Sequence, residues 1–401
     1  MRKHKSNKLI TILTLFLMGA GLIIIYAIGP LRANFMNSAY GLDYDTNYFF
    51  IHQLMSVGLA LGAFIVAFLF PYEKLRTFSK VILILGLVAC ALLQLLAFAH
   101  SSLASCQLGA CRWFNLGSLG SFQPAEILKL GLVLYLAQLI AQRRKEGKLE
   151  GREFWIPFVV YCGLSLGFVV VLQKDLGTGI VMIMIILSML LMSGIEMKKF
   201  WLVVGVIVLA GTLSIVTSEH RRERIMTFGQ ADSSDSYHID NAMLAIGTGG
   251  FWGVGIGNSV QATGYLPESI NDSVFAVMGE TFGFWGLMLV LVCYAVLLNQ
   301  LLKVSEHLQD LEQSLVVVGV FAWVTTHVVV NIGAMTGLIP LTGITLPLLS
   351  FGGTSMMFIA GALGVSLQLS CYTSREVRKN EDINSRRGVG GPHYTSSRRR
   401  A

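Results

Sequence analysis

Charged residues are scarce in this chain. Lys, Arg, Asp and Glu make up 13% of its 401 residues, whereas roughly 25% is usual in a soluble globular protein. Hydrophobic residues make up 54% and the mean hydropathy is +0.65. Runs such as 81–96 and 179–192 contain no charge at all. This composition excludes a fold with a water-exposed surface around a core and indicates many membrane-spanning helices.

Cysteine is also rare, and none of the Cys and His spacings matches a zinc site. Cys106 and Cys111 share one loop, and their spacing leaves both a disulfide and two free thiols open. The other four lie in or beside apolar segments and are interpreted as inert packing residues: Cys90, Cys162, Cys293 and Cys371.

No internal repeat is evident, which argues against the secondary transporters that are built from repeats. The glycine-rich segment 247–259 contains spacings like those of a dinucleotide-binding loop, but no strand precedes it and no βαβ unit surrounds it. We interpret it as a tight re-entrant or surface loop in which glycines permit close backbone approach. A short helix is expected just before it, at 241–247.

Each membrane-spanning helix needs roughly 20 mostly apolar residues. The sequence therefore predicts an all-α polytopic membrane protein with about ten spans and a large extracytoplasmic loop, 218–270, between the seventh and eighth. The expected spans are 9–28, 50–70, 78–98, 124–141, 153–171, 176–194, 199–217, 272–302, 314–336 and 353–373.

Basic residues predict the orientation. Of the 30 Lys and Arg residues, 23 fall in segments on the N-terminal side of the membrane, so both termini are expected to be cytoplasmic. The first span resembles a signal sequence but is too long and lacks a cleavage site, so a retained anchor is expected. The domain organisation is a cytoplasmic N-terminus (1–8), a transmembrane domain (9–373) and a basic disordered tail (374–401) attracted to anionic lipid, not to nucleic acid.

Asp272 stands where a polar stretch meets an apolar run. An ionisable residue at that place is costly, so a functional role is favoured over capping of its own helix. Glu126 and Lys129 are three residues apart and share a helix face, either as a structural ion pair or as part of a site. His327 lies within an apolar run, and packing or bonding to a neighbouring helix is favoured over proton transfer.

Two further groups lie near the expected outer face. Arg112 precedes the fourth span beside Trp113, as an interface anchor or as a phosphate ligand. Asp175 precedes the sixth span, where capping of that helix is at least as plausible as substrate binding. An outer cavity with one base, one carboxylate–ammonium pair and several arginines suits an anionic, lipid-linked substrate.

Five segments, in order, resemble the SEDS (shape, elongation, division and sporulation) family of peptidoglycan glycosyltransferases. Gly-Ala-Cys-Arg-Trp at 109–113 resembles the family's Gly-Ala-Arg-Arg-Trp, and Gln-Pro-Ala-Glu-Ile-Leu-Lys-Leu at 123–130 resembles Gln-Pro-Ser-Glu-x-x-Lys-Leu. The segments 173–178 and 266–280 are similar to its Gln-Pro-Asp-Leu-Gly-Thr and Leu-Pro-Glu…Thr-Asp-Phe-Ile-Phe-Ala-Val strings. The segment 331–355, which includes Pro340, Pro347, Gly352 and Gly353, is similar to the closing signature of the family.

The resemblance implies a ten-helix SEDS fold that polymerises lipid II on the outer face of the bacterial cytoplasmic membrane, with Asp272 as the essential carboxylate and Glu126–Lys129 as a buried ion pair. The segments 256–261 and 265–268 look more like the division branch (FtsW) than the elongation branch (RodA). That branch implies a place at the division septum, with a class B penicillin-binding transpeptidase and divisome proteins as partners. The sequence departs from the family strings at Cys111, Lys174, Asn271, Ser273–Val274 and Thr281.

The resulting hypothesis is an inverting transfer in which Asp272 acts as general base on the acceptor sugar and undecaprenyl pyrophosphate leaves the lipid-linked glycan. Cations would offset the charge of the leaving group. No carboxylate cluster for a metal is visible and the sequence indicates no particular cofactor, although assistance by Mg²⁺ or Mn²⁺ is left open. The alternatives are a transporter (a lipid II flippase or a proton-coupled carrier), a RodA-type elongation polymerase, and a scaffold that recruits a transpeptidase. The candidate substrate or pyrophosphate ligands are Arg112, Lys129, Asp175, Arg221, Arg222, Arg224 and Glu268.

Overall fold

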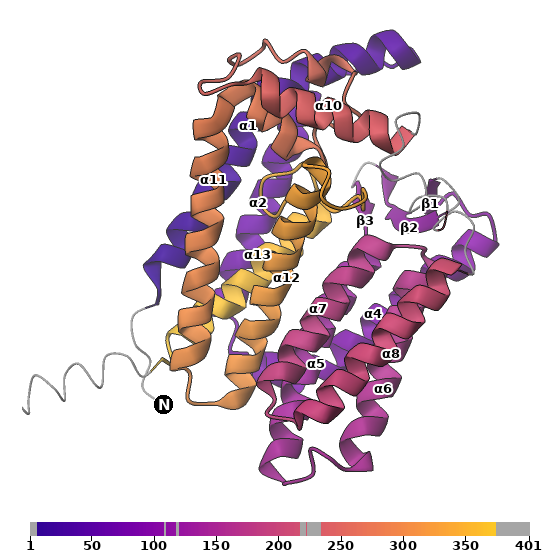
Figure 1. Cartoon of the computed structure of the whole chain (residues 1–401), viewed down its shortest axis with the longest axis vertical. Helices are drawn as coiled ribbons and strands as arrows, with labels where there is room; N and C mark the ends of the chain where they lie inside the picture. Colours follow the sequence, from indigo (N-terminus) through magenta and orange to yellow (C-terminus); the bar gives the residue numbers. More distant parts are fainter. Residues whose placement is uncertain (1–5, 108–109, 118–119, 217–221, 223–233, 374–401) are drawn as a thin grey trace, which may run out of the picture.

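A computed structural model of the chain describes residues 6–107, 110–117, 120–216, 222 and 234–373, and most of these are helical (Figure 1). A π-helical turn, η2 (Gly167–Leu172), continues α6, and a 3₁₀ turn, η3 (Gln261–Thr263), precedes α11. The helices are α1 (Lys8–Tyr40), α2 (Tyr48–Leu69), α3 (Tyr72–Thr77), α4 (Ser79–Phe98), α5 (Pro124–Lys145), α6 (Arg152–Leu166), α7 (Leu176–Met192), α8 (Met197–Val216), α10 (Ser234–Thr248), α11 (Val274–His307), α12 (Leu311–Met335) and α13 (Gly353–Ser370).

The predicted number of spans is confirmed. Within the described residues, nine helical segments are long and apolar enough to cross a membrane, and α7 is a shorter apolar helix of 17 residues. The bounds differ most at α1, which was expected to end at residue 28. It continues to Tyr40, where Gly41 adopts a left-handed conformation (φ 65°) and its N–H bonds back to Asn37 O.

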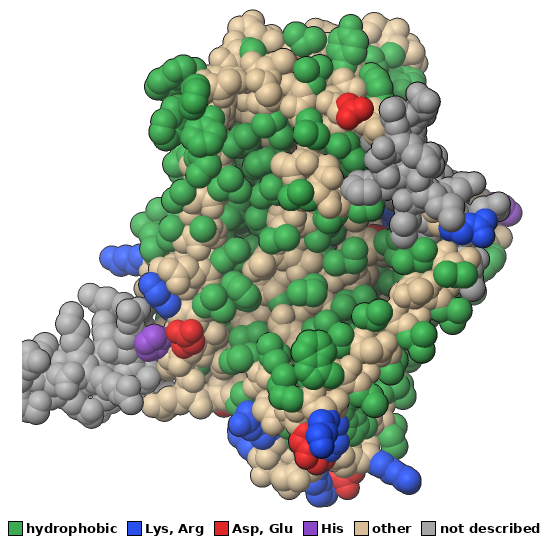
Figure 2. Space-filling view, in the orientation of Figure 1, with side chains coloured by type: hydrophobic (Ala, Val, Ile, Leu, Met, Phe, Trp, Pro, Cys, Tyr) green, Lys and Arg blue, Asp and Glu red, His purple; other side chains and the backbone are tan. Residues whose placement is uncertain are grey.

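The surface of the bundle is apolar where lipid would surround it. Along α8, only Phe200 is buried. Figure 2 shows hydrophobic side chains over the middle of one face, with charged side chains gathered mainly near its ends. So much exposed apolar surface is unsuited to water and fits a hydrocarbon environment. The protein is therefore a multi-pass membrane protein.

The long helices form two groups that meet at α12. Figure 1 shows α1, α2, α11 and α13 on one side and α4 to α8 on the other. Helix α12 contacts α5 and α7 in one group and α11 and α13 in the other. Because 78% of its most apolar window is buried, α12 can carry polar side chains that both groups reach.

The basic loops meet at one end of the bundle, which we call the Asp310 end. The start and finish of the described chain lie together there, because Asn7 N donates to Ser370 Oγ at 3.0 Å. Lys145 lies 4.0 Å from Asp310, and Lys199 pairs with Glu150 at 2.7 Å. The structure thus gathers the loops that the sequence analysis assigned to one side. Residues 374–401 of the predicted tail lie outside the described residues.

The opposite end, which we call the Asp272 end, contains a small sheet that the sequence analysis did not predict. Strands β1 (Ala104–Gln107), β2 (Ala110–Asn115) and β3 (Ser121–Phe122) pair antiparallel in the order β1-β2-β3. Cys106 and Cys111 face each other across β1 and β2 and are joined in a disulfide. The structure therefore selects the disulfide over two free thiols.

The glycine-rich segment 247–259, called the glycine loop below, inserts into a break in α11. At the break Gly283 has φ 67° and ψ −165°, a conformation available essentially only to glycine. Four backbone groups at the break bond to the loop. Glu280 O and Thr281 O accept from Val254 N (2.9 Å) and Gly255 N (3.1 Å), while the N–H groups of residues 284 and 285 donate to the carbonyls of 250 and 251. The predicted close backbone approach is confirmed, and the helix before the loop, α10, begins at Ser234 instead of 241.

Candidate functional site

Asp272 lies in the turn that leads into α11. The helix begins at Val274, Ser273 occupies the N-cap position, and no side chain caps the helix. Capping, the alternative weighed for Asp272, is therefore not its role. Asn331 of α12 instead holds the backbone of this residue, because its Nδ2 donates to Asp272 O at 2.7 Å and to Ile344 O at 2.7 Å.

The pKa of the Asp272 carboxyl group lies near neutral pH. Burial raises the pKa of Asp272 from 3.8 to about 7, and the negative charge of Glu268 adds to the rise. The N–H groups of residues 272 and 273 act in the opposite direction. Among the described residues, its buried Oδ1 has no hydrogen-bond partner. A carboxylate with a free acceptor atom and such a pKa suits a general base.

Polar side chains of α12 extend from this turn toward the middle of the bundle. Asn331 and His327 are one helical turn apart, and His327 Nε2 lies 3.4 Å from Lys129 Nζ. The Nδ1 atom of His327 lies 3.2 Å from Thr345 O, which can only accept a hydrogen bond. An ammonium group can only donate, so His327 is neutral, with its proton on Nδ1. The prediction that His327 bonds to a neighbouring helix is confirmed.

The predicted pair Glu126–Lys129 is present and buried. Lys129 Nζ donates to Glu126 Oε1 at 2.8 Å, and the two side chains are 1% and 2% exposed. The ammonium group also lies 4.7 Å from the centroid of the Trp323 ring, within the range of a cation–π contact. Glu126 Oε2 is buried and has no hydrogen-bond partner among the described residues. Two charges in this setting are costly, which marks the pair as more than packing.

The structure gives Arg112 and Asp175 structural contacts. Arg112 donates from Nε to Gln173 O (3.3 Å) and from a terminal nitrogen to Lys174 O (2.7 Å), so it fixes the turn before α7. Asp175 is the N-cap of α7 and accepts from both N and Oγ1 of Thr178. The capping alternative for Asp175 is therefore confirmed.

The other predicted residues are distributed around Asp272. Glu268 is exposed and accepts from Asn271 Nδ2. The segment 336–352 packs against the Asp272 turn, where Phe351 N donates to Ile270 O at 2.8 Å, and Pro347 O accepts from Tyr294 OH. Gly352 is the N-cap of α13 and Gly353 its first residue, while Pro340 lies in this segment. Arg222 is exposed, and Arg221 and Arg224 lie outside the described residues.

Two contributors were missed by the sequence analysis. The sequence analysis included Asn331 only as part of a motif. Its amide side chain within an apolar run was the signal that could have indicated a role at the site. Glu280, 2% exposed, accepts from Ser259 Oγ at 2.5 Å and from the N–H groups of Val260 and Gln261. A carboxylate at the seventh residue of a membrane helix was again the signal. Glu280 ties the end of the glycine loop to the helix that follows Asp272.

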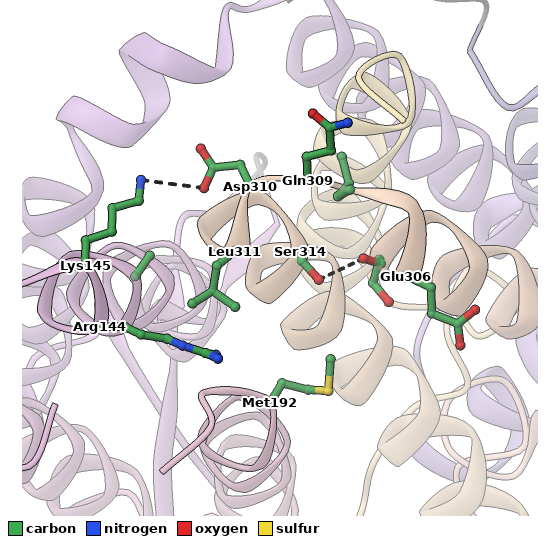
Figure 3. A pocket seen from close by; sticks show the side chains of 11 residues that line it. Arg144, Lys145, Met192, Glu306, Gln309, Asp310, Leu311 and Ser314 are labelled. Atoms are coloured by element: carbon green, nitrogen blue, oxygen red, sulfur yellow. Dashed lines mark hydrogen bonds and ion pairs between the residues drawn. The ribbon is translucent and has the colours of Figure 1, made fainter. Parts of the chain in front are cut away.

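The cavity drawn in Figure 3 is a separate feature. It is an open hollow of about 800 Å³ between the ends of α5 and α7 and the turn from α11 to α12. Arg144, Lys145, Glu306 and Asp310 line it, so its charges balance. It lies at the Asp310 end, about 30 Å along α12 from Asn331 at 1.5 Å per residue. It is therefore no part of the Asp272 site.

No group of three or more His, Cys, Asp or Glu side chains that could hold a metal ion occurs among the described residues. Among the described residues, the site oxygen atoms without a partner include Asn331 Oδ1, Asp272 Oδ1 and Glu126 Oε2, and the last two belong to two separate single carboxylates. The residues described here therefore do not form an all-protein cage for a divalent cation.

Fold and site together define a polytopic helical membrane protein with a buried ion pair and a poised carboxylate at one end of its bundle. Residues 7–375 match the family model of the cell cycle proteins FtsW, RodA and SpoVE. The chain belongs to this family, as the resemblance in its motifs indicated.

Relatives and solved structures agree with this assignment. The chain is 32% identical over 379 residues to stage V sporulation protein E of Bacillus subtilis, covering 93% of this chain and 99% of that protein. It is 30% identical over 389 residues to the probable peptidoglycan glycosyltransferase FtsW of the same organism, covering 92% and 91%. A chain of a peptidoglycan synthase complex shares the fold with a TM-score of 0.70 at 24% identity, covering 91% of this chain and 97% of that one. Thermus thermophilus RodA also shares the fold, with a TM-score of 0.65 at 23% identity, covering 91% of this chain and 96% of that one.

Proposed function

We propose that this protein polymerises lipid II into β-1,4-linked glycan strands, with Asp272 as general base. The observation that carries the proposal is the Asp272 carboxyl group, whose backbone Asn331 holds and whose buried Oδ1 has no partner among the described residues. Family membership and relatives named as peptidoglycan glycosyltransferases support the reaction class.

In the proposed step, Asp272 removes the proton of the 4-hydroxyl group of the acceptor's N-acetylglucosamine. The oxygen then attacks the anomeric carbon of N-acetylmuramic acid on the lipid-linked glycan, and the bond to undecaprenyl pyrophosphate breaks. The α-linked donor becomes a β-1,4 product, so the configuration inverts. The proton remains on Asp272 until solvent removes it, and a pKa of about 7 permits both halves of this cycle.

The cationic side chains act on the reaction from a distance or from the edge of the Asp272 site. Lys129 is buried and paired with Glu126 at 2.8 Å, so its charge acts as part of a dipole whose field is screened less than in water. Arg112 holds the turn at residues 173–175 and adds charge there. Exposed Arg222 is a candidate pyrophosphate ligand from the loop, with Arg221 and Arg224. A divalent cation would assist by binding the pyrophosphate together with solvent, and no step above depends on it.

Orientation and partners follow as further proposals. The basic loops gather at the Asp310 end, which the positive-inside rule assigns to the cytoplasm together with both termini. The Asp272 site then opens to the outer face, where lipid II is polymerised. Relatives named FtsW favour septal wall synthesis, and the solved synthase complex supports a transpeptidase partner of the class B penicillin-binding type, acting with divisome proteins.

The test is polymerisation of labelled lipid II by the purified protein in liposomes, with and without the cognate transpeptidase. Asp272→Asn is expected to insert into the membrane and bind lipid II but to lose polymerisation by at least about 100-fold. Asp240→Asn, which removes an exposed carboxylate of α10 instead, should remain active. A fully active Asp272→Asn would contradict the base assignment, and movement of lipid II across the bilayer without polymer would favour a flippase.

A further inference from the structure

His238 of α10 lies against the turn that presents Asp272. Its Nε2 atom is 2.6 Å from Ser273 Oγ, and the imidazole is buried, with 8% of the residue exposed. Ser273 is one of the positions at which this chain departs from the family string, which has Phe there. The structure thus pairs an unusual serine beside Asp272 with a histidine from a helix 35 residues earlier.

The hydrogen-bonding capacities of the partners fix the direction of this contact. Ser273 Oγ also lies 2.9 Å from Pro267 O and donates to it. A hydroxyl group has one proton and a carbonyl oxygen can only accept, so the proton of Ser273 is used in that bond. The hydrogen bond to His238 must then come from the imidazole. Nε2 therefore carries a proton and donates to Ser273 Oγ.

This contact closes the turn 267–273. Within the turn, Asn271 N and Ser273 N both donate to Glu268 O, at 2.9 and 3.2 Å. Glu268 itself has φ 48°, in the left-handed region that residues other than glycine rarely adopt. A turn with such a residue needs support from outside. On one side Asn331 supplies that support, and on the other side His238 supplies it through Ser273.

We propose that His238 is a positioning residue which, by donating to Ser273 Oγ, fixes the turn 267–273 and so the carboxylate of Asp272. The proposal rests on the proposed role of Asp272 as general base. In this arrangement His238 touches no substrate, and it acts through Ser273. The hydroxyl of Ser273 is oriented away from His238, toward Pro267 O, and the fixed turn holds in place the N–H groups of residues 272 and 273, which lower the pKa of Asp272 against the effect of burial.

The neighbouring titratable groups do not replace His238 in this role. Among the described residues of α10, the turn, α11 and α12, each of them faces solvent or is bound elsewhere. Tyr237 and Asp240 are exposed. The other three have partners elsewhere: Glu268 is bound by Asn271, Glu280 by Ser259, and His327 by Lys129.

The first experiment measures lipid II polymerisation by His238→Ala, His238→Gln, Ser273→Ala and the double variant His238→Ala/Ser273→Ala. His238→Ala is expected to lower kcat about tenfold, as for one lost hydrogen bond, while KM is unchanged. The acid limb of its pH–rate profile should move to higher pH, because the support of the ionised carboxylate is lost. His238→Gln, which keeps an N–H donor, should restore most of the rate, and the double variant should be no worse than Ser273→Ala.

A second measurement is independent of activity. The difference in Tm between Asp272 and Asp272→Asn is followed against pH, once with His238 and once with His238→Ala. The pH at which this difference levels off reports the pKa of Asp272 in the folded protein, and it should rise in the His238→Ala background. Asp240→Asn serves as the control for a change of charge on α10 and should leave both readouts unchanged.

Some outcomes would overturn the proposal. They are an unchanged rate and pH profile in His238→Ala, a His238→Gln as slow as His238→Ala, or the same titration of Asp272 in both backgrounds. The proposed function fails in a different way, when wild type and Asp272→Asn polymerise equally well or not at all with the transpeptidase present. In that case the Tm titration still decides whether His238 supports the turn.

Discussion

Asn331 of α12 holds the main chain of Asp272, with its Nδ2 donating to Asp272 O at 2.7 Å and to Ile344 O at the same distance. One amide group thereby joins three segments, namely the turn before α11, helix α12 and the loop that precedes α13. The position of the candidate base thus depends on a residue 59 positions later in the chain.

Replacing this amide tests that dependence. Asn331→Leu preserves volume but removes the donor from two carbonyl groups. We expect the polymerisation rate to fall by roughly 10- to 100-fold, because small displacements of a catalytic group have effects of this size, and stability to fall by about 1–3 kcal/mol. The measurements are kcat on lipid II and Tm in detergent. Val329→Ala, on the exposed side of the same helix, is the control, and equal rates in the two variants would remove Asn331 from the site.

The ionisation of Asp272 predicts the pH dependence of the reaction. Its folded pKa is raised from 3.8 to about 7, so the base is mostly protonated below pH 6 and ionised above pH 8. The rate should therefore increase through pH 7 and level off above it. The measurement is initial polymerisation rate between pH 5.5 and 9 at saturating lipid II. A rate that is flat across this window would contradict the assigned pKa.

The raised pKa of Asp272 also affects the stability of the fold, which should fall, while the reaction rate rises, as the pH increases. A carboxyl group with a raised folded pKa stabilises the fold fully below its unfolded pKa, and this contribution is lost as the pH rises through the folded value. Wild type should therefore lose Tm relative to Asp272→Asn between about pH 4 and pH 7. Thermal unfolding of both proteins across this range checks the sign, and a loss of relative stability on acidification would show that the shift is wrong.

The Glu126–Lys129 pair predicts non-additive mutational effects. Glu126→Gln leaves the Lys129 charge beside neutral His327, and Lys129→Met leaves a buried carboxylate, so each should cost roughly 3–5 kcal/mol. The double variant Glu126→Gln/Lys129→Met removes both charges and should be less destabilised than Lys129→Met alone. Thermal or denaturant unfolding of the four proteins gives the coupling energy. Additive effects would mean that the 2.8 Å contact contributes nothing of its own.

Local sequence rules predicted the parts of this protein that depend on neighbours along the chain. The three-residue spacing of Glu126 and Lys129 placed both on one helix face, and the apolar runs located ten long apolar helices of the described chain. The N-cap role of Asp175 follows from the same kind of rule. Contacts between distant segments could not be predicted, because no periodicity encodes them. Examples are Asn331 to Asp272, His238 to Ser273, and the disulfide-bearing sheet, whose strands are only two to six residues long.

The break in α11 could not be predicted from the sequence for a different reason. Glycine is frequent in membrane helices, so Gly283 inside an apolar run gives no signal on its own. Its φ of 67° and ψ of −165° require glycine, and a Cβ atom there would lie 2.4 Å from Gly253 N. The backbone of the break has no alternative partners in hydrocarbon, so the glycine loop and the helix must form together.

Gly283→Ala should therefore disrupt the glycine loop and the helix end that follows Asp272. We expect a loss of about 3 kcal/mol or more, from a glycine-only conformation and from the clash with the loop backbone, together with loss of polymerisation. Gly211→Ala is the matched control, because Gly211 lies in membrane helix α8 and a Cβ atom there meets nothing within 4 Å. Folded yield, Tm and lipid II polymerisation distinguish the two. If Gly283→Ala retains wild-type Tm, α11 can run straight through residue 283, and the Asp272 turn does not depend on the glycine loop.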